Sequence, residues 1–188
     1  MTLAAACILS CGLLGEEEAA PPFLTDGDHL EVHPACLALS GGSPDAGTTA
    51  QSVVLVGTRA NGRGAESVRV TISVEPCPGD SSEVTTICGD ATRAPANSWS
   101  AIELFADGTT CKGIVSTAVQ CLLGSDGVAT FGVRAVGSAV GGYIPVCMGA
   151  AARDAGATTS DAATAFSRTL PVFVVDRPAS DAGTKDAP

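Results

Sequence analysis

The sequence predicts an all-β fold, a sandwich or a barrel, built from about eight or nine short strands. Its hydrophobic residues recur with a period of two, which is typical of strands, rather than with the helical period of 3.6. In the segment 67–74 (SVRVTISV), for example, Val68, Val70, Ile72 and Val74 share one face. Turns rich in Gly, Asp, Asn and Ser interrupt these segments, and no segment shows a clear helical pattern.

Strands are expected where short β-branched segments lie between such turns, at 30–39, 52–58, 67–74, 101–105, 114–119, 128–136, 143–147 and 169–175. The turns include ANGRG, ADGTT and GSDG, whose residues tolerate positive φ or bond to their own backbone. The segment 150–165 is rich in Ala, but Gly156 and several Thr, Ser and Asp residues make a loop as consistent with it as a helix.

The composition describes a single acidic domain with few aromatic residues. The chain has 188 residues, a length that suits one domain with short extensions. Its net charge of −10 argues against a nucleic-acid-binding protein, which needs a basic surface. Aromatic residues make up only 4% of the chain, so the core must come from Val, Ile, Leu and Ala, which bury less area. We therefore expect disulfides to support a thin core.

The N-terminus has the features of an export signal. The apolar run 3–14 is shorter than the about 20 residues that a membrane-spanning helix needs. Around Cys11 the sequence ILSCG resembles a bacterial lipobox, which implies cleavage before Cys11, acylation of that residue and residues 1–10 as signal peptide. Gly12 in place of Asp favours the outer membrane or cell surface by the same resemblance. Signals begin with basic residues and the first one here is Arg59, so we expect the signal to be incomplete.

The two ends of the chain predict flexible extensions around one domain. Residues 11–28 are acidic and contain a Pro-Pro pair, as expected of a solvated linker. Residues 178–188 have almost no apolar side chains to bury, and we expect them to be disordered. The domain is therefore expected to span residues 29–177.

Two segments resemble bacterial immunoglobulin-like domains of the invasin and intimin type. In 51–74 (QSVVLVGTRANGRGAESVRVTISV) an apolar strand runs through an Asn-Gly turn into an alternating strand, as in the first hairpin of those domains. In 124–150 (GSDGVATFGVRAVGSAVGGYIPVCMGA) the order of turn and strands is similar to their later half. The resemblance implies an immunoglobulin-like β-sandwich that serves surface presentation, spacing or adhesion, with no catalysis. The cysteines and the insert 76–98 depart from the family pattern.

Six cysteines follow Cys11, and an even number in an exported chain predicts a disulfide framework. No CxxC pair occurs, which argues against common zinc sites. We expect Cys77–Cys88 and Cys111–Cys121, because each pair closes a short loop. The family resemblance adds Cys36–Cys147, since its first strand commonly lies near its last strands. The alternative is that Cys36 or Cys147 pairs with a cysteine of the insert 76–98.

Sequence motifs for catalysis are largely missing. Ser138 stands at the wrong position in GSAVG for a nucleophile elbow, and no glycine-rich loop carries the lysine of a phosphate-binding loop. His29, Glu31 and His33 alternate along a strand, where they would share one face and offer zinc ligands. We favour the simpler interpretation that these three form the solvated face of the first strand.

Other polar and aromatic residues allow similar pairs of interpretations. Several acidic residues lie in loops next to glycine, where they would bind calcium or, as we favour, form turns: Asp26, Asp28, Asp45, Asp107 and Asp126. Trp99 and Tyr143 would form a ligand platform or, as we favour, pack half-buried.

The predicted function is that of a non-enzymatic, envelope-anchored immunoglobulin-like module for surface presentation, adhesion or structural interaction. Its expected partners are the membrane, through the lipid on Cys11, and an envelope or surface protein. No cofactor is expected. The alternatives are a carbohydrate- or peptidoglycan-binding module and a metal-dependent hydrolase that uses His29 and His33.

Overall fold

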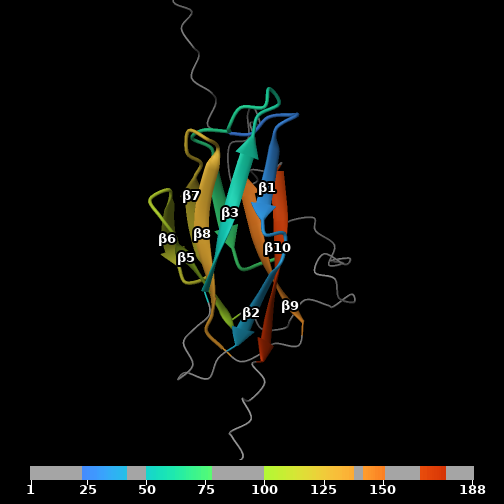
Figure 1. Ribbon diagram of the computed structural model, residues 1–188, viewed down its shortest axis with the longest axis vertical. Coiled ribbons are helices and arrows are strands. Elements are labelled where there is room, and N and C mark those ends of the chain that lie inside the picture. Colours follow the sequence, from blue (N-terminus) through green and yellow to red (C-terminus); the bar gives the residue numbers. More distant parts are fainter. Residues whose placement is uncertain (1–22, 42–49, 78–99, 138–141, 151–165, 177–188) are drawn as a thin grey trace, which may run out of the picture.

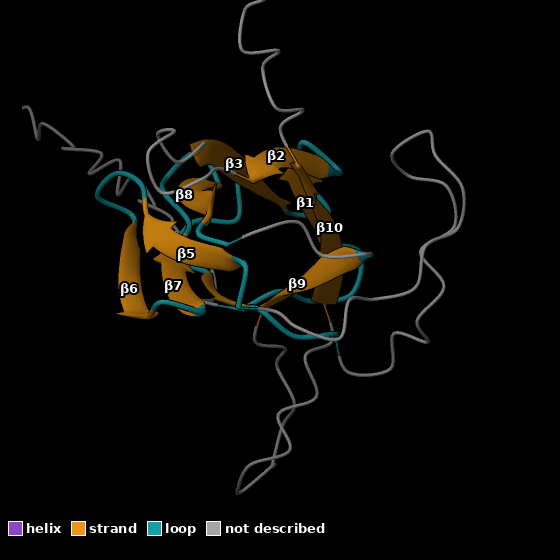
Figure 2. Ribbon diagram, turned by 90° about the horizontal axis from the view of Figure 1, so that it is seen from below, coloured by secondary structure: helices purple, strands orange, loops and turns teal. Residues whose placement is uncertain are grey.

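The protein is a β-sandwich. A computed structural model describes residues 23–41, 50–77, 100–137, 142–150 and 166–176. All regular structure in these ranges is strand, in two sheets of four and six strands (Figures 1 and 2). The same ranges contain no helix that could span a membrane. The predicted all-β sandwich is confirmed.

The sheets are built from ten strands. The four-stranded sheet has the order β1 (His29–His33), β3 (Ala50–Thr58), β8 (Val128–Ala135) and β5 (Ile102–Ala106). The six-stranded sheet has the order β2 (Leu37–Gly41), β10 (Phe166–Asp176), β9 (Tyr143–Ala150), β4 (Arg69–Ser73), β7 (Ala118–Leu122) and β6 (Cys111–Val115). All neighbours are antiparallel except β2 and β10, which run parallel.

Two expected strands are divided in the structure. The segment 30–39 becomes β1 and β2, which belong to different sheets. Pro34 lies between them, and a proline cannot donate a ladder hydrogen bond. The segment 114–119 is a hairpin, because β6 ends at Val115 and β7 begins at Ala118.

Part of the strand order corresponds to that of an immunoglobulin-like sandwich. The order β1-β3-β8-β5 corresponds to the A-B-E-D sheet of that fold, and β10-β9-β4 corresponds to the G-F-C sheet. The departure is the β6–β7 hairpin. It follows β5 in the chain but extends the six-stranded sheet beyond β4.

The core is aliphatic, as the composition predicted. Alternating residues of β3 and β4 point inward, and Phe131 of β8 is the largest of the fully buried side chains. The remaining large side chains that are fully buried are Leu or Ile with one Met, among them Leu30, Leu55, Ile72, Ile144, Met148 and Leu170. Every residue of β9 is buried, so this strand is covered on both faces.

The chain enters and leaves the sandwich at opposite ends. The start of β1 pairs with the end of β3, since His29 lies opposite Thr58. The end of β10 pairs in parallel with the end of β2, since Asp176 lies opposite Gly41. Figure 1 shows β1 beginning near the top of the long axis and β10 ending near the bottom.

Candidate functional site

The segment before β1 is held to the sandwich by a buried ion pair. Asp28 and Arg59 are 4% and 9% exposed, and their Oδ2 and NH1 atoms lie 3.0 Å apart. Arg59 also donates to the Phe23 carbonyl at 2.6 Å. Leu24 is fully buried. Residues 23–28 were expected in the linker, but they pack on the domain, so the folded part begins before His29.

Hydrogen bonds keep Asp28 ionised. Its Oδ2 accepts from the Thr25 backbone N–H at 2.8 Å, and its Oδ1 accepts from the Ala60 N–H at 2.9 Å. Burial acts to raise the pKa of Asp28, but the hydrogen bonds from Thr25, Ala60 and Arg59 outweigh it and hold the pKa below its usual value. The carboxylate closes a turn and anchors a neighbouring loop, so its role is structural.

His29, Glu31 and His33 lie on the solvated side of β1. All three are exposed, while Leu30 between them is buried. His33 Nε2 and Glu31 Oε2 lie 3.3 Å apart, with both side chains more than half exposed. No group of three or more potential metal ligands occurs in the described ranges. The geometry agrees with the interpretation of a solvated strand face.

A shallow cavity of about 460 Å³ lies where two turns meet. The β5–β6 turn contributes Asp107, Thr109 and Thr110, and the β7–β8 turn contributes Ser125 and Asp126. Asp107 accepts a hydrogen bond from Ser52 of β3, and Asp126 accepts one from the backbone N–H of Val128 at 3.0 Å. Both carboxylates therefore stabilise their turns, and the rest of the lining combines hydroxyl groups with glycine and apolar residues such as Val128 and Ala129.

Close backbone packing holds the β7–β8 turn, which contributes to this cavity. The Gly57 N–H donates to the Gly127 carbonyl at 2.8 Å, and the Ala65 N–H donates to the Gly57 carbonyl at 2.8 Å. Gly127 has a φ of +77°, and a Cβ there would collide with the Gly57 carbonyl. Only glycine both lacks a Cβ and adopts a positive φ without strain.

The disulfides agree only in part with the expected pairs. Cys111 pairs with Cys121, as predicted. Cys77 pairs with Cys147, which overturns both Cys77–Cys88 and Cys36–Cys147 and agrees with the alternative in which Cys147 bonds to a cysteine of the insert. Cys36 is also disulfide-bonded.

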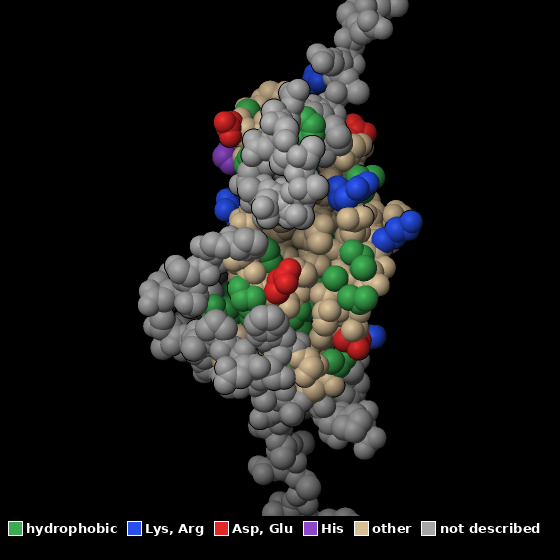
Figure 3. Space-filling view, turned by 180° about the vertical axis from the view of Figure 1, so that it is seen from behind, with side chains coloured by type: hydrophobic (Ala, Val, Ile, Leu, Met, Phe, Trp, Pro, Cys, Tyr) green, Lys and Arg blue, Asp and Glu red, His purple; other side chains and the backbone are tan. Residues whose placement is uncertain are grey.

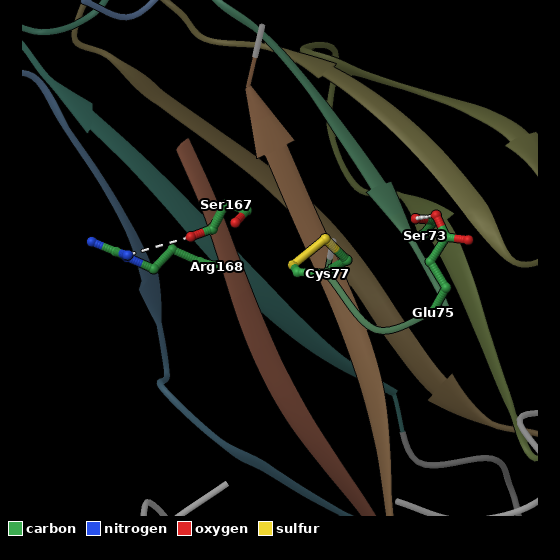
Figure 4. Close-up of a disulfide and its surroundings, with 6 residues drawn as sticks. Ser73, Glu75, Cys77, Ser167 and Arg168 are labelled. Atoms are coloured by element: carbon green, nitrogen blue, oxygen red, sulfur yellow. Dashed lines mark hydrogen bonds between the residues drawn. A yellow bond between two sulfur atoms is a disulfide. The ribbon is translucent and has the colours of Figure 1, made fainter. Parts of the chain in front are cut away.

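The reason for the Cys77–Cys147 pair is the register of two strands. Ser73 at the end of β4 lies opposite Cys147 of β9, so the chain leaving β4 passes that cysteine. The two Cα atoms lie 4.9 Å apart, and both cysteines are buried. Figure 4 shows the disulfide against β9, with Ser73 and Glu75 on one side and Ser167 and Arg168 of β10 on the other.

The aromatic residues provide no visible ligand platform in the described part of the chain. Tyr143 is 3% exposed and packs against Phe173, with ring centroids 6.2 Å apart. Several residues considered from the sequence lie outside the described residues: Cys11, Asp45, Cys88, Trp99 and Ser138, together with the signal 1–10, most of the linker and the tail 178–188.

No protein-family model and no curated protein matches this chain.

Two features of the site region were missed from the sequence. The Asp28–Arg59 pair joins residues 31 positions apart, and nothing in the local pattern links them. The second is the outer edge of β6. Its hydrophobic residues were expected to belong to a single strand at 114–119. The exposed Ile114 and Val115, each 57% exposed, mark this edge.

Proposed function

We propose that the protein is a non-enzymatic immunoglobulin-like module, anchored to the bacterial envelope through Cys11 and serving presentation or adhesion at the surface. The observation that supports this most is the path of the chain, which enters the sandwich at one end and leaves at the other. A domain with this path acts as a spacer, because it holds the segments joined to its two ends apart.

The disulfides support export. Structural disulfides form and persist in oxidising compartments such as the periplasm and the cell surface. The loop-entropy model gives about 4 kcal/mol of stability for a cross-link that spans the 70 positions between Cys77 and Cys147. Cross-links of this kind compensate for the thin aliphatic core.

In the proposed arrangement the lipid holds one end of the chain at the membrane. An acyl chain contributes about 0.8 kcal/mol for each buried methylene, so a diacylglycerol provides firm anchoring without a membrane-spanning helix. The acidic linker gives reach, and the buried Asp28–Arg59 pair fixes where the linker joins the sandwich. The loops and sheet edges are then available to a partner.

The geometry gives less support to the carbohydrate-binding alternative. The cavity between the β5–β6 and β7–β8 turns offers hydroxyl groups, but its two carboxylates already bond to Ser52 and Val128. Saccharide sites commonly use an accessible aromatic ring, and Tyr143 is buried. We therefore keep presentation as the proposed function.

The anchor is tested by acyl labelling of the chain expressed in a bacterium. Labelling by a palmitate analogue and recovery in the membrane fraction should both be lost in Cys11→Ser. Cys7→Ser is the matched control, since Cys7 lies in the expected signal and should not be acylated. Labelling that persists in Cys11→Ser would disprove the lipid anchor.

A further inference from the structure

The two sheets have four edge strands, and at three of them one backbone group forms a hydrogen bond with the other sheet. Arg168 of β10 donates through Nε to the Leu30 carbonyl of β1 at 3.1 Å. Gln51 of β3 donates to the Ala38 carbonyl of β2 at 3.2 Å. The Leu104 N–H of β5 donates to the Ser116 carbonyl at 2.8 Å. Such contacts occupy backbone groups that would otherwise pair with another chain.

The fourth edge, β6, is different. The Leu122 N–H donates to the Thr110 carbonyl at 2.8 Å, which marks these two residues as a hydrogen-bonded pair. Because such pairs alternate in antiparallel strands, the backbone groups of Cys111 and Gly113 point away from β7. The 4.0 Å between the Cα atoms of Cys111 and Cys121 is in keeping with a non-hydrogen-bonded pair. Among the described residues, nothing hydrogen-bonds to the outward backbone groups of Cys111 and Gly113.

Exposed hydrophobic side chains accompany this open edge. Ile114 and Val115 of β6 are each 57% exposed, and Leu122 of β7 is 48% exposed. Figure 3 shows the molecule from behind, with hydrophobic side chains on several parts of that face, including the side where β6 and β7 lie. Lys112 is the single charged residue between Cys111 and Leu122.

The hairpin that carries this edge is fixed at both ends. The Cys111–Cys121 disulfide joins its strands at the base. At the tip, the carbonyls of Ser116 and Thr117 accept hydrogen bonds from Leu104 and Val74 at 2.8 and 3.0 Å. A rigid edge loses little conformational entropy when a strand is added to it, which favours binding.

We propose that β6 binds an extended peptide segment of a partner protein as an added antiparallel strand. Unpaired backbone N–H and C=O groups select an extended chain, and the neighbouring side chains select its sequence. The partner strand should carry a β-branched apolar residue against Val115 and a carboxylate within reach of Lys112.

A second copy of the chain fits this edge less well. A five-residue edge is about 17 Å long. Stable dimers of folded domains bury about 1,200–2,000 Å², far more than two such edges provide. Each copy also carries a net charge of −10, which opposes self-association. A single strand needs only its backbone and a few side chains to reach the edge.

This inference names the partner class of the proposed interaction module but does not depend on the lipid anchor. Strand binding is measured on the purified, oxidised chain, whereas the anchor is tested in cells. If strand binding fails, the proposal of a lipid anchor therefore still stands, and the reverse also holds.

The probe is a fluorescent peptide with the sequence of residues 117–123, the natural neighbour of β6, carrying Cys121→Ser. A second version adds Gln120→Glu, and a third carries Val119→Pro, which removes a ladder donor. We expect saturable binding. The Gln120→Glu peptide should have the highest affinity, the parent peptide a lower one and the Val119→Pro peptide the lowest. Hydrogen exchange of the Cys111 and Gly113 amides should slow when the peptide is bound.

Protein variants locate the binding. Val115→Thr should weaken binding about threefold to fivefold, because a cross-strand side-chain contact contributes up to about 1 kcal/mol. Val136→Thr is the matched control, since Val136 is 41% exposed and lies beyond β8. Lys112→Glu should abolish the preference for the Glu peptide. The proposal would be overturned if Val115→Thr and Val136→Thr bound the peptide equally well. It would also be overturned if the peptide slowed hydrogen exchange only at amides away from β6, or if it did not bind. Concentration-dependent dimers that protect the same amides would identify a second copy as the occupant instead.

Discussion

Asp28 is the residue on which the N-terminal part of the sandwich depends. Asp28→Asn leaves the buried Arg59 without its counter-charge, so we expect the free energy of unfolding at pH 7 to fall by about 3 kcal/mol. Urea unfolding measures this change. Asp26→Asn is the control, because Asp26 is exposed and its loss should change stability by less than about 0.5 kcal/mol.

The effect of Asp28 should also depend on pH. Its pKa is lower in the folded state, so the carboxylate stabilises the fold above its unfolded pKa of about 4. This contribution is lost as the pH falls through the folded pKa. The stability difference between the wild type and Asp28→Asn should therefore shrink as the pH falls from neutral to below about 4. A difference that stays constant over this range would contradict the assignment.

At the level of single residues, the sequence predicted which way side chains point better than it predicted which residues they contact. Alternation placed Leu30 inside and His29 and Glu31 outside, as observed. The glycine next to Asp28 identified that residue as part of a turn, and its hydrogen bonds with Thr25 support this. The partner Arg59 could not be inferred, because a contact across 31 positions depends on how β1 and β3 align.

The β6–β7 hairpin is the element whose prediction was partly right and partly wrong. The Cys111–Cys121 pair followed from its short loop. The expected strand 114–119 was wrong, because Ser116 and Thr117 form the hairpin turn without the Gly, Asn or Pro that usually marks one. The turn carbonyls instead accept hydrogen bonds from the backbone N–H groups of Val74 and Leu104, contacts that local preference does not predict.

The disulfide at the base of this hairpin should stabilise the domain. Its cysteines are 10 positions apart, for which the loop-entropy model gives about 3 kcal/mol. We expect the double variant Cys111→Ala/Cys121→Ala to unfold at a lower urea concentration by a corresponding amount. Ser125→Ala, on the exposed β7–β8 turn, serves as a control that should leave the midpoint unchanged. A midpoint that does not move in the double variant would show that the cross-link contributes nothing to stability.

For the whole molecule, the period of two predicted an all-β sandwich or barrel, but it did not predict the long-range pairing. Six cysteines allow 15 pairings, and local spacing favoured Cys77–Cys88. The observed Cys77–Cys147 pair depends on β4 and β9 being neighbours, with Ser73 opposite Cys147. That neighbour relation is a property of the folded sandwich and leaves no mark on the residues beside either cysteine.

The path of the chain from one end of the sandwich to the other has a mechanical consequence. A pull on the two ends would slide β10 along its parallel neighbour β2, so that the hydrogen bonds between them resist together instead of opening one by one. The chain between Cys77 and Cys147 would stay covalently closed and could not lengthen. In single-molecule stretching, the oxidised protein should therefore extend less on unfolding than the protein in reductant, and equal extensions would contradict this. A module built in this way suits a position where a cell surface bears load.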